Sequence, residues 1–133
     1  MADISGYHHL SFTVTDLARS TAWYTDVLGF AVVTEVEGAG LRRNRLRHPA
    51  GGIILTLTEH EAGSGDRFDE RPTGLDHLAF QLGSPAAVEA LVRRFRELGV
   101  EHSEHDPGGG GPRVFFRDPD NIQLEAFAPH SAG

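Results

Sequence analysis

A five-residue motif occurs twice in this chain, and the repeat constrains the fold more than any other feature. Residues 8–12 read HHLSF and residues 76–80 read DHLAF, each with a histidine in second place. Each copy begins a strand-like alternation of apolar and polar residues, which is followed by a helical stretch ending in Leu-Gly and then by short β-like segments. The sequence therefore predicts an internal duplication, in which each half has the order β-α-β-β-β.

The predicted helix ends are marked by residues that favour caps. Asp16 and Ser84 suit N-cap positions because their side-chain oxygens can accept hydrogen bonds from the first helical turn. Pro85 fits that turn, and Gly99 fits the left-handed position after the second helix. One face of each stretch carries residues at helical spacing, which predicts two amphipathic helices: Leu17, Thr21, Tyr24 and Leu28, and Val88, Leu91, Val92, Phe95 and Leu98.

The length and the repeat together predict one α+β domain, residues 1–133, built from two tandem βαβββ modules. Module 1 covers about 7–59, a polar linker covers 60–74 and module 2 covers about 75–128. The later strands are expected at 30–36, 41–47, 52–59, 100–103, 112–117 and 121–127.

Alternation along four of these strands predicts two different sheet faces, since successive side chains point to opposite sides. One face is aliphatic and would pack under the helices, with Leu10, Phe12, Val14, Ile53, Leu55, Leu57, Leu78, Phe80, Leu82, Ile122, Leu124 and Ala126. The other has few of the long charged residues of a solvated face, which indicates the lining of a polar cavity. It carries His9, Ser11, Thr13, Ile54, Thr56, Thr58, His77, Ala79, Gln81, Gln123, Glu125 and Phe127.

The polar face contains a candidate metal site. When the last strands of the two halves are aligned, Thr56 matches Glu125, and His9 already matches His77. Two imidazoles and one carboxylate suit a divalent ion such as Fe, Mn, Ni, Co or Zn, and they leave coordination positions open for a substrate. A single strand histidine is more often hydrogen-bonded than metal-bound, but three ligand types at repeat-related positions favour the metal.

Composition excludes several classes of function. The chain has no cysteine and no lysine, so disulfides, thiolate nucleophiles, Schiff bases and a phosphate-binding P-loop lysine are ruled out. A net charge of −7 argues against nucleic acid as a partner. No export signal and no membrane-spanning run is present, which indicates a cytoplasmic protein. The basic run 41–48 could hold an anion, although a solvated hairpin face is the simpler interpretation.

Two end motifs resemble a known family. HHLSFTVTDLARSTAWYTDVLGF at 8–30 and FFRDPDNIQLEAF at 115–127 resemble the opening and closing motifs of the vicinal oxygen chelate superfamily, which includes glyoxalase I, bleomycin-resistance proteins and extradiol dioxygenases. Asn121 stands where glycine is usual. The resemblance covers about residues 7–128 and implies curved sheets around a cavity. It also implies a metal held by His9, His77 and Glu125.

Departures from the family pattern narrow the activity. Glyoxalase I has a second glutamate where this chain has Thr56, which disfavours lactoylglutathione lyase activity. Fosfomycin-resistance enzymes resemble the chain more closely, with a hydroxyl residue matching Ser11, but they carry a basic segment after the last strand. That leaves a lyase, isomerase, addition or dioxygenase reaction open.

Two functions fit these observations. In the favoured one, the protein is a metalloenzyme whose ion chelates adjacent oxygens of a small-molecule substrate. Glu125 and Gln81 would handle protons, and the substrate-binding residues would be Ser11, Thr13, Thr56, Thr58, Gln123 and Phe127. In the alternative, the protein sequesters an antibiotic or another small metabolite without turnover, as bleomycin-resistance proteins do.

Two further expectations concern assembly and access. Family members of this length usually exchange modules, so we expect a homodimer with active sites shared between chains. The glycine run 108–111 is expected to form a lid over the pocket, although an ordinary long turn is an equal alternative.

Overall fold

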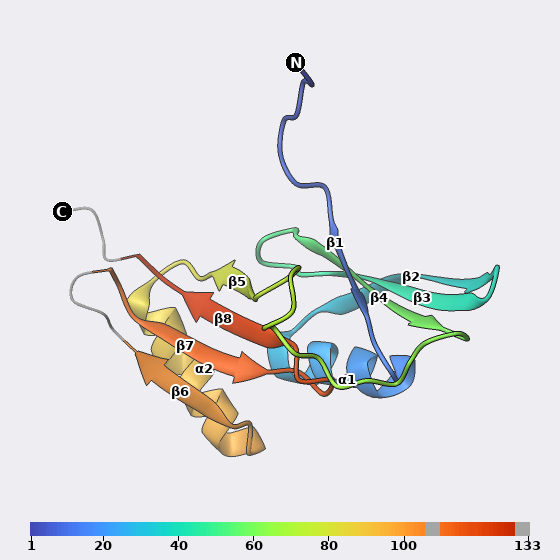
Figure 1. Ribbon diagram of the computed structural model, residues 1–133. Coiled ribbons are helices and arrows are strands. Elements are labelled where there is room, and N and C mark those ends of the chain that lie inside the picture. The colour runs from blue at the N-terminus through green and yellow to red at the C-terminus, as the bar shows by residue number, and fades with distance from the viewer. Residues whose placement is uncertain (106–109, 130–133) are drawn as a thin grey trace. The chain divides into compact units, whose positions relative to one another are not determined.

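A computed structural model describes residues 1–105 and 110–129 and divides the chain into two compact units, 1–66 and 67–133. Each unit contains one helix and a four-stranded sheet (Figure 1). Unit 1 comprises β1 (Leu10–Thr13), α1 (Leu17–Leu28), β2 (Ala31–Gly38), β3 (Leu41–Arg47) and β4 (Ile54–His60). Unit 2 comprises β5 (Leu78–Gln81), α2 (Pro85–Leu98), β6 (His102–His105), β7 (Arg113–Arg117) and β8 (Gln123–Phe127).

The two sheets have the same topology, which confirms the duplication. Their strand orders are β1-β4-β3-β2 and β5-β8-β7-β6, and the first pair in each is parallel while the others are antiparallel. The register also repeats, because Leu10 pairs with Leu55 and Leu78 pairs with Leu124. Both units are therefore copies of one βαβββ plan, and the predicted α+β class is confirmed.

The predicted caps are present at both helices. Asp16 and Ser84 accept hydrogen bonds from the backbone N–H groups of Arg19 and Ala87. Gly29 and Gly99 end the helices with φ of 80° and 71°, a left-handed conformation that a Cβ would strain. The backbone N–H of Val100 then donates to the carbonyl oxygen of Phe95, 2.8 Å away. This bond extends the helix cap, so β6 begins later than the expected 100–103.

The helix of each unit covers one face of its own sheet. In unit 1 the fully buried Tyr24 of α1 lies 6.4 Å from Phe12 and 6.1 Å from Phe30 between ring centroids. In unit 2, Phe95 of α2 is fully buried, with its ring 4.7 Å from that of Phe116. Removing such a ring costs about 3–5 kcal/mol, so these clusters fix which sheet face is covered and which remains for a site.

Most of the predicted aliphatic face is buried, including Phe12, Leu55, Leu57 and Leu124. Ile53 was also expected there but is 47% exposed, and Leu98, expected on the apolar face of the second helix, is 48% exposed. Ile53 precedes the first residue of β4 and Leu98 is the last residue of α2, so both lie at the ends of their elements. In the expected lid, residues 108 and 109 lie outside the described ranges.

Candidate metal centre and polar sheet faces

The centre of the candidate site in unit 2 is a histidine facing a carboxylate. His77 precedes β5, and Glu125 lies on the adjacent strand β8, where it pairs with Ala79. His77 Nε2 is 3.3 Å from Glu125 Oε2, and the Glu125 side chain is only 8% exposed. Both residues belong to the predicted polar face, and the structure brings His77 Nε2 and Glu125 Oε2 together.

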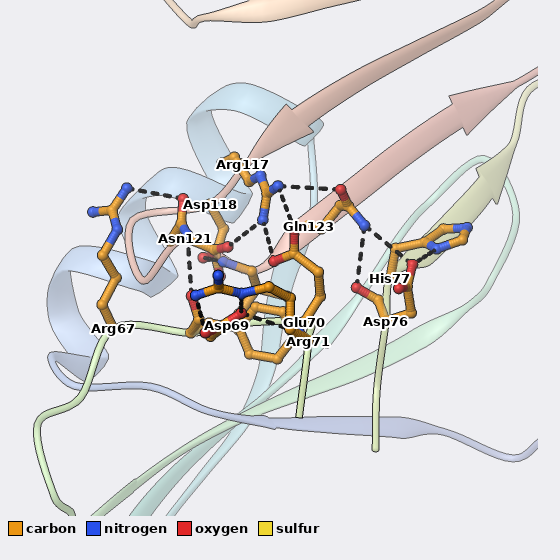
Figure 2. Close-up of polar contacts among 12 residues, drawn as sticks. Arg67, Asp69, Glu70, Arg71, Asp76, His77, Arg117, Asp118, Asn121 and Gln123 are labelled. Carbon is orange, nitrogen blue, oxygen red and sulfur yellow. Dashed lines mark hydrogen bonds and ion pairs between the residues drawn. The ribbon is translucent and has the colours of Figure 1, made fainter. Parts of the chain in front are cut away.

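The imidazole of His77 is oriented by a chain of polar contacts (Figure 2). Its Nδ1 lies 2.6 Å from Asp76 Oδ1. The side-chain amide of Gln123 donates to two oxygens of Asp76, the backbone carbonyl oxygen at 3.3 Å and Oδ1 at 3.2 Å. Arg117 in turn donates to Gln123 Oε1 at 3.1 Å. A carboxylate at Nδ1 favours the tautomer with the proton on Nδ1, and this leaves the Nε2 lone pair directed at Glu125.

In this tautomer no proton lies between His77 Nε2 and Glu125 Oε2. The Nε2 lone pair and the carboxylate Oε2 are both acceptors, so they repel at 3.3 Å unless a proton or a cation lies between them. Two ligand atoms that each lie about 2.1 Å from one ion are roughly 3.0–3.4 Å apart for angles of 90–109°. The spacing, the donor types and the oriented ring therefore fit a divalent ion.

Arg113 also lies at this site, although the sequence pattern did not predict it. Its Nη1 lies 3.4 Å from Glu125 Oε1, so the two carboxylate oxygens face different partners. Its guanidinium carbon stacks 4.9 Å from the ring centroid of Phe127, and its buried Nε has no hydrogen-bond partner among the described residues. Arg113 thus fixes the Glu125 orientation and covers one face of Phe127. Its place beside Glu125 depends on the β7–β8 register, in which it pairs with Phe127, and the local sequence pattern does not show that register.

Residues 67–74, the second half of the expected linker, belong to unit 2, where they contact the turn between β7 and β8. Asn121 has φ of 69°, the left-handed conformation that explains why glycine is common at this position. Its amide donates to the carbonyl oxygen of Phe68 and its Oδ1 accepts from Arg67, at 3.0 and 2.9 Å. The asparagine therefore supplies two contacts that a glycine could not.

Arg117 forms a two-point ion pair with Glu70 in this region. Its two terminal nitrogens donate to the two oxygens of Glu70, each at 2.9 Å (Figure 2). This hydrogen bonding lowers the pKa of Glu70 to about 2 and raises the pKa of Arg117. Because Arg117 also holds Gln123, residues 67–76 and the β7–β8 turn support His77 as one polar network.

In unit 1 the equivalent positions carry different chemistry. Ser11 and Thr13 of β1 pair with Thr56 and Thr58 of β4, in the same register that pairs Ala79 with Glu125. The predicted match of Thr56 with Glu125 is therefore confirmed. Thr58 Oγ1 contacts Ser11 Oγ at 3.3 Å and accepts from Arg43 Nε at 2.8 Å, whereas the buried Thr56 Oγ1 has no hydrogen-bond partner in the described part of the chain.

His9, the third expected ligand, belongs to unit 1. It precedes β1, is exposed, and has its Nδ1 2.8 Å from Nδ1 of His8. Within either unit, the described residues contain no group of three His, Cys, Asp or Glu side chains that could hold a metal. The expected ligands are thus divided between the units, with His77 and Glu125 in unit 2.

Comparison with known proteins identifies the family. The family model for the glyoxalase/bleomycin resistance protein/dioxygenase superfamily matches residues 6–126. The chain belongs to this superfamily. A glyoxylase/bleomycin resistance protein/dioxygenase domain from Frankia sp. EAN1pec is 35% identical in sequence, with a TM-score of 0.88 over 96% of this chain and 100% of that one.

Other superfamily relatives include both a metal complex and proteins without a described function. A mutant of the fosfomycin resistance protein FosX from Listeria monocytogenes, complexed with Mn(II) and 1S,2S-dihydroxypropylphosphonic acid, is 27% identical, with a TM-score of 0.74 over 96% of this chain and 93% of that one. The uncharacterized protein YwkD of Bacillus subtilis is 30% identical over 93% of this chain and 97% of its own length. These matches establish the superfamily and leave the reaction open.

The remaining expected site residues lie on the polar face of the superfamily fold in unit 2. Gln81 is exposed and pairs with Phe127. Gln123, expected to bind substrate, instead has its amide and its Oε1 engaged by Asp76 and Arg117. It therefore supports His77.

Among the helices of the described residues, none has both the length and the apolar character needed to span a membrane.

Proposed function

We propose that this superfamily member is a small metalloenzyme. A divalent ion would be held by His77 and Glu125 together with His9, and it would chelate adjacent oxygens of a small-molecule substrate. The observation that supports this is the facing pair of His77 Nε2 and Glu125 Oε2, which are 3.3 Å apart with the ring oriented by Asp76. With the ring proton on Nδ1 toward Asp76, the Nε2 lone pair and the carboxylate of Glu125 face each other, and a divalent ion between them would be bound by both.

The donor set restricts the metal without fixing it. Two imidazoles and one carboxylate suit Fe, Mn, Ni, Co and Zn, and the Mn(II) in the FosX complex shows that a relative binds one of these ions. When bound, such an ion polarises substrate oxygens and stabilises negative charge that develops on them. Arg113 would hold one carboxylate oxygen of Glu125, so that the other remains directed at the ion.

The protein's own residues limit the reaction type. With no lysine and no cysteine in the chain, the chemistry is a proton transfer, an addition or an oxygenation, of lyase, isomerase or dioxygenase type. Glu125 and Gln81 are the groups proposed to accept or donate hydrogen at the substrate. Ser11, Thr13 and Thr58 would orient it by hydrogen bonds. Thr56 in place of a carboxylate is the reason that we do not propose lactoylglutathione lyase activity.

Metal content tests the proposal directly. Protein purified without a metal-chelating tag should contain close to one divalent ion per site, measured by elemental analysis, and a chelator should lower its melting temperature. His77→Ala should lose the ion, and His48→Ala is a matched control because His48 instead contacts the carbonyl oxygen of Leu28. A folded, metal-free protein that binds a large planar ligand would contradict the enzyme and support the sequestering alternative.

We also propose a homodimer in which each site takes His9 from one chain and His77 with Glu125 from the other. The proposal rests on the division of these residues between two compact units. Mixing His9→Ala with Glu125→Ala protein under conditions of subunit exchange should restore metal binding in heterodimers, because one ligand set is then intact. No recovery at any mixing ratio would contradict shared sites.

A further inference from the structure

Strand β3 places two arginines on the polar face of unit 1. Arg43 pairs with Thr58 and Arg45 pairs with Thr56 in the antiparallel β3–β4 register. Paired residues point to the same side of a sheet, so both arginines share the face of the threonines. Asn44 lies between them and points the other way, where its amide donates to Thr21 of α1 at 3.0 Å. The basic run is therefore not simply a solvated hairpin face.

These two arginines have no acidic partner among the described residues. Their neighbour Arg42, on the opposite face, forms an ion pair with Glu59. In the described part of the chain, by contrast, no carboxylate lies within ion-pair distance of Arg43 or Arg45. Arg43 uses only its Nε, toward Thr58, and Arg45 has no hydrogen bond to any described residue. Two guanidinium groups two residues apart repel each other unless an anion lies between them.

The threonine across from Arg45 also lacks a partner. Thr56 is 6% exposed, and its Oγ1 is buried without a hydrogen bond among the described residues. A buried hydroxyl left unpaired costs about 1–3 kcal/mol, so a ligand oxygen at this position would be stabilising. Unpaired donors from Arg43, Arg45 and Thr56 thus gather on one patch of one sheet face.

We propose that this patch, Arg43, Arg45 and Thr56, binds a tetrahedral oxyanion, a phosphonate or phosphate group. One arginine fork already satisfies both oxygens of a carboxylate, whereas two forks and a hydroxyl match a group with three oxygens. The proposal rests on the proposed function in one respect, namely that the oxyanion is part of the substrate. The substrate class would then be a small phosphonate or phosphate that also has two adjacent oxygens for the ion.

The test is calorimetric titration of the full-length protein with methylphosphonate and with inorganic phosphate at constant ionic strength. Wild type should bind both, and Arg45→Gln should weaken binding about tenfold or more. Arg42→Gln is the matched control, since it removes the same charge from the same strand on the opposite face, and its affinity should stay within about twofold. Arg45 makes no hydrogen bond to a described residue, so its replacement leaves known contacts intact even if Arg43→Gln does not fold.

Three outcomes would overturn the proposal: no saturable binding by wild type, an equal loss in Arg42→Gln, or acetate binding as tightly as methylphosphonate. Repeating the titration with His77→Ala protein separates this proposal from the proposed function. Anion binding that persists in a metal-free His77→Ala variant supports the patch even if the metalloenzyme is wrong. Anion binding that disappears with His77 places the oxyanion on the ion rather than on Arg43 and Arg45, and would overturn the patch.

Discussion

The two units share a backbone plan and differ in what they place on its polar face. Position for position, the β8 residues Glu125 and Phe127 correspond to the β4 residues Thr56 and Thr58, while β3 and β7 both place an arginine opposite the later residue of each pair. Unit 2 has a carboxylate held by His77 and Arg113. Unit 1 has hydroxyls beside arginines that have no acidic partner among the described residues. The two units therefore share a scaffold, but their side chains form a proposed cation-binding face in unit 2 and a proposed anion-binding face in unit 1.

This difference has a simple physical basis. Strand register and caps are set by backbone geometry and apolar packing, which tolerate any polar residue on the uncovered face. The polar face therefore changes at little cost to folding. Arg43 and Arg113 occupy equivalent positions, yet Arg43 contacts a hydroxyl and Arg113 contacts a carboxylate and an aromatic ring. The same residue type supports a different function because its neighbour on the adjacent strand differs.

The largest predicted effect is at Glu125 of unit 2, compared with Thr56 at the equivalent position of unit 1. Glu125→Gln should weaken divalent-metal affinity about a hundredfold or more, because it removes the charged ligand. Thr56→Val, the equivalent position in unit 1, should change it by less than about threefold. Isothermal titration with Mn(II) and Zn(II) on metal-stripped protein measures both. An equal loss of metal affinity in Glu125→Gln and Thr56→Val would contradict the proposal that Glu125 binds the ion and Thr56 does not.

A smaller effect is expected from the residue behind His77. Asp76→Asn should weaken metal affinity about tenfold, since it removes the carboxylate that fixes the imidazole tautomer. Asp69→Asn is the control: it removes a carboxylate from the same segment that bonds Arg71 and not His77. The same titration compares the two. If Asp69→Asn matches Asp76→Asn, the effect is one of net charge and not of ring orientation.

A carboxylate can also be introduced into unit 1, at the position equivalent to Glu125 of unit 2. Thr56→Glu should tighten metal binding by up to about tenfold, because it adds a carboxylate at the position equivalent to Glu125. Arg45 lies directly across from this residue and would compete for the new carboxylate, so Thr56→Glu combined with Arg45→Gln should bind metal more tightly than Thr56→Glu alone. Unchanged affinity in both variants would show that Thr56 does not face the ion.

The sequence allowed prediction of what depends on local pattern. The caps at Asp16 and Ser84 and the alternating faces follow from spacing, and the positions of His77 and Glu125 on the polar face follow from that alternation together with the repeat. Contacts that depend on strand register could not be predicted in the same way. Glu70 meets Arg117, and Gln123 meets Asp76, only because the segment before β5 lies along the β7–β8 turn. Asp76 is adjacent to His77 in sequence, but its carboxylate is also held by Gln123. Gln123 was predicted to bind substrate, and nothing in the sequence indicated its contact with Asp76.

The smallest predicted effect concerns the Arg117–Glu70 ion pair, which joins the segment before β5 to strand β7 in unit 2. Arg117 lowers the pKa of Glu70 from 4.5 to about 2. A carboxyl group with a lowered pKa in the folded state stabilises the fold above its unfolded pKa, and this contribution is lost as the pH falls from about 4.5 toward 2. Glu70→Gln should therefore lower the melting temperature at neutral pH by a few degrees at most, because the pair is partly exposed.

That difference between wild type and Glu70→Gln should shrink steadily below about pH 4.5 and vanish near about pH 2, which melting curves across this range can measure. Glu59→Gln is the control in unit 1, because Glu59 forms an ion pair with Arg42 but holds no segment against its sheet. If Glu70 acts through the network that leads from Arg117 to Gln123, Asp76 and His77, its replacement should also weaken metal binding slightly, and Glu59→Gln should not. A melting difference that stays constant with pH would show that Glu70 contributes by packing and not by charge.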